Sequence, residues 1–97
     1  MLTIMMHGFF AEHDVLLTPT LGALPPEIGR YDAAATAELH DTFSDWSRWE
    51  CFLPVFNVTG LPAVSLPLHI TDDGLPVGMQ LVAGFGREEL LLRLAAD

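Results

Sequence analysis

The sequence contains no lysine, a single cysteine and no long run of apolar residues. Without lysine, neither a lysine nucleophile nor a lysine base can operate within these 97 residues. One cysteine cannot form an internal disulfide, so Cys51 favours a reducing compartment. No stretch is apolar for long enough to span a bilayer, and no Lys or Arg precedes Arg30 to form the basic start of a secretory signal. We therefore expect a cytoplasmic protein.

Positive charge is scarce, and this excludes two classes of partner. Four arginines stand against 13 acidic residues, which gives a formal net charge of -9. Binding to nucleic acid or to an anionic membrane needs clustered cations, and these arginines are scattered along the chain. We expect no nucleic-acid partner and no membrane partner.

Residues that could carry catalysis, a cofactor or a metal do not form a recognised pattern. Ser65 lies at the start of a predicted strand without the GxSxG elbow of α/β hydrolases. The residues GFG at 84–86 begin a dinucleotide-binding motif, but Glu89 stands where its third glycine belongs and would repel a pyrophosphate. No metal-binding spacing joins the four histidines, which are His7, His13, His40 and His69. The residues alone therefore predict no catalytic group, no cofactor and no metal.

Apolar residues, by contrast, are plentiful for so small a protein. They make up 51% of the chain, and the mean hydropathy is +0.37. A chain of this size buries only about 64% of its unfolded surface. The surplus predicts an apolar surface that something else covers.

Periodicity and turn residues predict an α/β chain. Residues 2–12 favour a helix, residues 15–18 a strand buried on both faces and closed by Pro19, and residues 21–28 a loop. Apolar side chains at helical spacing, with an acidic stripe on another face, predict an amphipathic helix over residues 33–52 that ends at Pro54.

The second half of the sequence favours a hairpin followed by a helix. Residues 56–60 form a turn-like joint, and residues 63–70 and 76–83 are strands joined by a turn at residues 71–74. A helix begins near Glu88 and continues until Asp97 without a capping signal. The abrupt ends lead us to expect one end of a larger protein.

Four segments, in this order, resemble the amidase signature hydrolases. They are DVLLTPT at residues 14–20, FLPVFNVTGLPAVSLP at 52–67, DGLPVGMQLV at 73–82 and ELLLRLA at 89–95. The matching family patterns are YDVLLTPT, FTxPFNxTGxPAxSxP, DGLPxGxQLV and ATLLRLA. The resemblance covers most of the chain, and its specificity comes from four matches in the family's order.

The resemblance implies a fold and a missing catalytic centre. The fold would be the C-terminal part of a mixed-sheet α/β/α amidase, with about three strands and three helices in a single segment over residues 1–97. The family hydrolyses carboxamide C–N bonds with a serine, a second serine in a cis peptide and a lysine, all from its amino-terminal half. None of those motifs occurs here, so no catalytic residue can be assigned.

The resemblance also implies a contribution to a substrate pocket. Thr18, Pro19 and Thr20 match a strand end that opens onto the family's pocket. Phe52, Phe56 and Asn57 match a segment that runs beside it. The predicted wall residues are therefore Pro19, Thr20, Phe52, Phe56 and Asn57. Physical arguments keep two alternatives open: Phe56 as a core residue, and Asn57 as a turn or cap residue.

Two functional interpretations remain. In the first, the chain is the structural and pocket-wall portion of an amidase and is inactive alone, with an amide substrate bound only together with the absent amino-terminal part. In the second, it is a small acidic module without catalytic activity that associates with itself or with a partner. Both predict association, either as a homo-oligomer or with the rest of the amidase.

Overall fold

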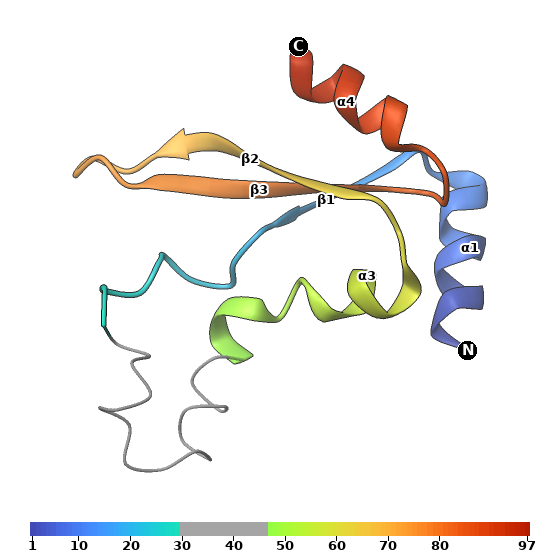
Figure 1. Cartoon of the computed structure of the whole chain (residues 1–97), viewed down its shortest axis with the longest axis horizontal. Coiled ribbons are helices and arrows are strands. Elements are labelled where there is room, and N and C mark those ends of the chain that lie inside the picture. The colour runs from blue at the N-terminus through green and yellow to red at the C-terminus, as the bar shows by residue number, and fades with distance from the viewer. Residues whose placement is uncertain (30–46) are drawn as a thin grey trace.

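The computed structural model describes residues 1–29 and 47–97, and within them an antiparallel sheet forms the centre (Figure 1). Its strands are β1 (Val15–Pro19), β2 (Ala63–Ile70) and β3 (Pro76–Ala83). Their spatial order is β1-β3-β2, so β3 is paired on both sides while β1 and β2 form the two edges.

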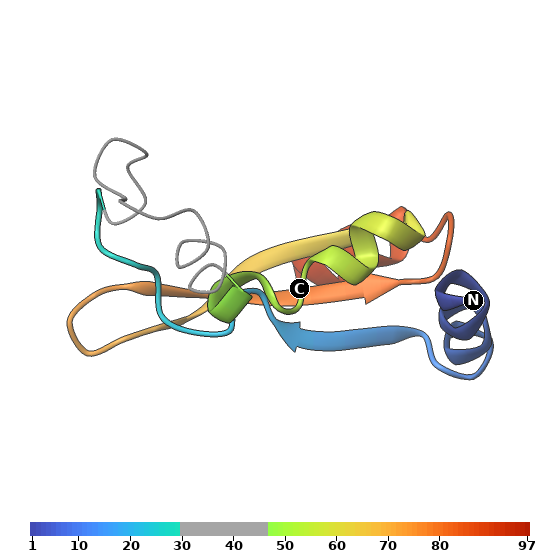
Figure 2. The ribbon, with the colours of Figure 1, turned by 90° about the horizontal axis from the view of Figure 1, so that it is seen from below.

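Helices cover both faces of this sheet. The short helix α3 (Pro54–Thr59) lies on one face and α4 (Glu88–Ala96) on the other, as Figures 1 and 2 show. The helix α1 (Leu2–Glu12) lies at the end of the sheet where β1 begins, and it contacts α3. The described residues therefore form an α/β/α arrangement.

Local chemistry explains the hairpin between β2 and β3. Gly74 adopts a positive φ of 93°, which a glycine reaches without steric cost. The amide of Thr71 donates to the Leu75 carbonyl at 2.8 Å, and the Leu75 amide donates to the Thr71 hydroxyl at 2.9 Å. The register of β2 against β3 shifts between Pro67 and His69, because proline has no amide hydrogen for the ladder.

The core lies between α3, α1 and the sheet. Phe56, Leu61 and Val82 are buried together, and Val82 is fully inaccessible. The half-buried side chains packed against them are Met6, Phe10, Leu16 and Val55. On the opposite face, Leu91 of α4 is buried, where that helix packs on β2 and β3.

Several sequence predictions match the structure at residue level. The predicted helix over residues 2–12 and the predicted strands over residues 63–70 and 76–83 are confirmed. The helix predicted from Glu88 is confirmed as α4, and residues 21–28 form no helix or strand. Within the part of the chain described here, no helix is both long and apolar enough to cross a membrane.

Two predictions about local structure were wrong. The predicted joint at residues 56–60 is part of α3, because Pro54 fits the first turn of a helix and Gly60, at φ 69°, closes it in the left-handed region. The strand β1 is not buried on both faces: Leu17 is 57% exposed, because β1 is an edge strand and no described helix covers this side chain.

Most of the predicted helix over residues 33–52 lies outside the described residues. Residues 47–50 are helical, and residues 51–52 form a turn before α3. Trp49, at the end of this segment, is half-buried.

Candidate functional site

A row of polar side chains crosses all three strands on the α3 face of the sheet. Gln80 of β3 lies opposite Thr18 of β1 and opposite Ser65 of β2 in the strand register. Directly opposed residues share one face of an antiparallel sheet. Thr20 follows the end of β1 and joins the same row, and we call Thr18, Thr20, Ser65 and Gln80 the polar row.

Gln80 is the centre of this row. Its side chain is 5% exposed, and it is the buried polar side chain of the described residues. The Nε2 group donates one hydrogen bond to the Thr18 hydroxyl at 3.0 Å and one to the Phe52 carbonyl at 3.0 Å. Both amide hydrogens are therefore used, as burial of a polar group requires.

The hydroxyls of Thr20 and Ser65 share a hydrogen bond of 2.6 Å across the central strand. Gly78 of β3 makes this possible, because a Cβ at this position would lie 2.9 Å from each hydroxyl oxygen. The Thr20 amide also donates to the Gly78 carbonyl at 3.1 Å. Because residue 78 has no side chain, a residue that follows β1 and a residue of β2 can form a hydrogen bond across β3.

The chain that leaves the polar row after Thr20 is held by the segment containing Trp49. The Gly22 amide donates to the Trp49 carbonyl at 2.9 Å, and the Trp49 indole donates to the Leu24 carbonyl at 2.6 Å. Gly22 has no room for a side chain, because a Cβ there would overlap the Arg48 carbonyl oxygen and lie 2.7 Å from the Cys51 sulfur. We call these contacts the loop clamp.

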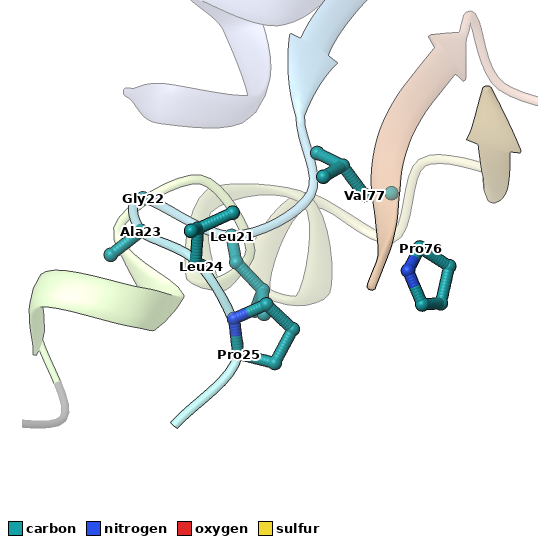
Figure 3. A pocket seen from close by; sticks show the side chains of 8 residues that line it. Leu21, Gly22, Ala23, Leu24, Pro25, Pro76 and Val77 are labelled. Atoms are coloured by element: carbon teal, nitrogen blue, oxygen red, sulfur yellow. The ribbon is translucent and has the colours of Figure 1, made fainter. Parts of the chain in front are cut away.

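A cavity of about 250 Å³ lies between this loop and the start of β3 (Figure 3). Leu21, Leu24 and Pro25 face it from the loop, and Pro76 and Val77 from the strand. Gly22, Ala23 and Gly78 complete the lining. Every described side chain that lines it is apolar or absent, so these residues bring no acid, base or nucleophile to the cavity.

The structure places the predicted wall residues in different surroundings. Pro19 is exposed at the end of β1, and Thr20 is half-buried in the polar row. Phe52 is half-buried and accepts a hydrogen bond from Gln80 through its carbonyl. Phe56 is buried in the core and Asn57 is exposed. None of the five lines the cavity, and their role in a substrate pocket stays a prediction.

The chemistry of this site is hydrogen bonding, since no catalytic pair forms within the described residues. The Ser65 hydroxyl bonds to another hydroxyl, that of Thr20, instead of a basic group. Among residues 1–29 and 47–97, no three His, Cys, Asp or Glu side chains gather as metal ligands. The geometry of this region therefore fits a scaffold that holds backbone segments in place.

Comparison with known protein families identifies the family to which this chain belongs. The family model described as Amidase matches residues 2–92. The chain belongs to the amidase family. The resemblance in the four sequence segments is thereby confirmed, and so is the α/β fold that it implied.

Relatives in the amidase family match nearly all of this chain. AmiC of Mycobacterium bovis is 49% identical over 89 residues, which cover 92% of this chain and 18% of AmiC. The 6-aminohexanoate-cyclic-dimer hydrolase of Pseudomonas sp. strain NK87 is 44% identical over 91 residues, covering 90% of this chain and 18% of that enzyme. The hydrolase of the same name from Paenarthrobacter ureafaciens is 41% identical over 91 residues, with the same two coverages of 90% and 18%.

A solved amidase-family structure agrees with these alignments. The structure of 6-aminohexanoate cyclic dimer hydrolase superposes with a TM-score of 0.75 at 39% identity, covering 92% of this chain and 19% of that one. The chain thus spans less than a fifth of the length of the relatives that it matches, as the prediction of a portion of a larger amidase requires.

Sequence reasoning missed Gln80 and the loop clamp. One signal for Gln80 was available: in the alternation of β3 it shares a face with Val82, so a polar residue stands on a face meant for the core. The loop clamp left no such signal, because its partners, the Trp49 indole among them, are distant in the sequence and only the tertiary fold brings them together.

Proposed function

We propose that this chain is the structural and pocket-wall portion of a carboxamide C–N hydrolase and is inactive by itself. The observation that carries the proposal is the pair of coverages: about nine-tenths of this chain matches amidase-family proteins, but only 18–19% of each of them. The absence of lysine supports it, because the resemblance to the amidase signature hydrolases implies a lysine in the catalytic centre.

The physical role proposed for the chain follows from the site. Hydrogen bonds of the polar row hold residues 18, 20 and 52 to the central strand, and the loop clamp ties residues 22–24 to Trp49. Residues 19, 20, 52, 56 and 57 would then form part of a pocket wall whose catalytic groups come from elsewhere in the complete enzyme. An amide substrate is therefore bound only by the complete assembly.

A chimera tests this proposal. In the Pseudomonas hydrolase, the segment that aligns with this chain is replaced by residues 2–92, and ring opening of the 6-aminohexanoate cyclic dimer is assayed. We expect turnover by the chimera, none by the 97-residue chain alone, and none by the same enzyme with the segment deleted. Turnover of the cyclic dimer or of simple amides by the chain alone would overturn the proposal, and so would a folded chimera without activity.

A second candidate function, self-association without catalysis, is favoured by exposed apolar side chains on the two edge strands. Leu17 of β1 is 57% exposed, and Leu68 and Ile70 of β2 are 62% and 64% exposed. Unpaired strand edges that carry such side chains are prone to pair with another chain. This candidate predicts a homo-oligomer, and light scattering that shows a monomer at micromolar concentration would contradict it.

A further inference from the structure

Gln80 stands between two backbone segments that are distant in the sequence. Its Nε2 group contacts the Phe52 carbonyl directly, at the start of residues 52–57. The same nitrogen donates to the Thr18 hydroxyl, and that hydroxyl donates in turn to the Pro19 carbonyl at 2.9 Å. The Gln80 amide is therefore connected to residue 52 by one hydrogen bond and to residue 19 by two successive hydrogen bonds.

The environment of Gln80 makes these contacts costly to lose. At 5% exposure, the Gln80 amide has little access to water that could replace its two partners. Removing one partner of a hydrogen bond at a buried site costs more than an ordinary exposed hydrogen bond contributes. An amide is also the side chain that suits the position, since it supplies two donors from one nitrogen.

We propose that Gln80 is a positioning residue, which fixes both predicted wall segments, residues 19–20 and residues 52–57, to the central strand. The inference rests on the proposed function for its consequence in catalysis, but its structural part stands on the hydrogen bonds alone. Gln80 does not touch the substrate, and it acts through the Phe52 carbonyl and through the Thr18 hydroxyl.

Hydrogen exchange on the 97-residue chain tests the structural part. Gln80→Met keeps the length of the side chain and removes both donors. We expect the bonded amides of residues 53, 56 and 57 to exchange about tenfold faster, and those of residues 20 and 22 severalfold faster, while the amides of α4 keep their rates. An equal rise in all segments, α4 included, would show a general loss of stability and overturn the inference, as would unchanged rates at residues 53–57.

Two further variants test the two arms of the contact. Thr18→Val removes the route to Pro19 and leaves the bond to Phe52, so only residues 20–22 exchange faster. Gln80→Glu cannot donate to the Phe52 carbonyl, and as an acceptor it takes the single Thr18 hydroxyl proton away from the Pro19 carbonyl, so both segments behave as in Gln80→Met. Met79→Leu, at the adjacent position on the other face of β3, is the matched control and changes neither segment.

Kinetics of the chimera test the consequence for the pocket. A displaced wall weakens binding of substrate and transition state alike, so Gln80→Met raises KM about tenfold and leaves kcat within twofold. An unchanged KM in an active chimera would contradict the inference. If the unmodified chimera is inactive, the proposed function fails, while the exchange rates still decide whether Gln80 positions the two segments.

Discussion

The α3 face of the sheet has two halves that are built differently from the same three strands. In one half, which we call the apolar half, Leu16 and Val82 pack against Phe56 and Leu61. In the other half lies the polar row, where Thr18, Gln80 and Ser65 are opposed across the strands. The two halves are adjacent: on each strand they are only two residues apart, because every second residue of a strand lies on the same face.

The two halves contribute different properties. Burial of a large apolar side chain contributes about 1.5–3 kcal/mol to stability, but it does not fix the orientation of the groups in contact. A hydrogen bond contributes only about 0.5–1.5 kcal/mol, yet it fixes distance and angle. The apolar half therefore supplies most of the stability, and the polar row determines where the backbone of residues 18–20 and 52 lies.

The largest effect is expected in the apolar half. Phe56→Ala removes a ring that is 7% exposed and leaves a cavity beside Val82. We expect the free energy of unfolding to fall by about 3–5 kcal/mol, measured by urea denaturation with circular dichroism. Phe85→Ala is the matched control, since that ring is 75% exposed and its loss should change stability by less than about 0.5 kcal/mol. Equal losses in both variants would contradict a core in this half.

An intermediate effect is expected at the loop clamp, which leads out of the polar row. Gly22→Ala forces a Cβ against the Arg48 carbonyl and the Cys51 sulfur, so the free energy of unfolding falls by about 1–3 kcal/mol. Trp49 fluorescence should shift toward that of an exposed indole, because its bond to the Leu24 carbonyl is broken.

Gly8→Ala gives the control for this substitution. Gly8 lies within α1 with open space around its Cβ position, so alanine should stabilise the chain by about 0.5–1 kcal/mol through helix propensity. A destabilising Gly8→Ala, or a neutral Gly22→Ala, would contradict the packing described for the corresponding glycine.

The smallest effect is expected at the exposed end of the polar row. Ser65→Ala removes the hydrogen bond to the Thr20 hydroxyl, but that hydroxyl can bond to water instead. We expect a loss of less than about 1 kcal/mol in the free energy of unfolding, measured in the same denaturation experiment. A loss as large as that of Phe56→Ala would remove the distinction between the two halves.

The elements of this fold could largely be predicted from the sequence where local signals are strong. The alternation in residues 76–83 and the turn residues at Gly74 define the hairpin without tertiary information. The prediction of a turn-like joint at residues 56–60 was wrong, because a proline such as Pro54 can mark the start of a helix as well as the end of one. The exposure of Leu17 depends on which elements lie beside β1. The apolar sequence of this strand does not specify which elements those are.

The site was harder to predict than the fold. The resemblance to a family identified Thr20 and Phe52 as interesting, but it gave no reason for their position. For Phe52 that reason is the hydrogen bond from Gln80, and for Thr20 it is the hydrogen bonds to Ser65 and to the Gly78 carbonyl, which all join segments distant in the sequence. Hydrogen bonds between distant segments, such as that of Trp49 with Leu24, follow from the assembled structure and leave no periodic pattern.

The strand order β1-β3-β2 has a consequence for how the chain folds. The hairpin of β2 and β3 joins neighbours in sequence, and hairpins of this kind close in about 1–10 μs. The strand β1 is instead separated from the hairpin by all residues between Pro19 and Ala63. Pairing β1 with β3 closes this long loop, which costs more chain entropy. Gln80 can meet Thr18 only when β1 has paired with β3. We therefore expect the polar row to be completed late in folding, after the hairpin of β2 and β3 has formed.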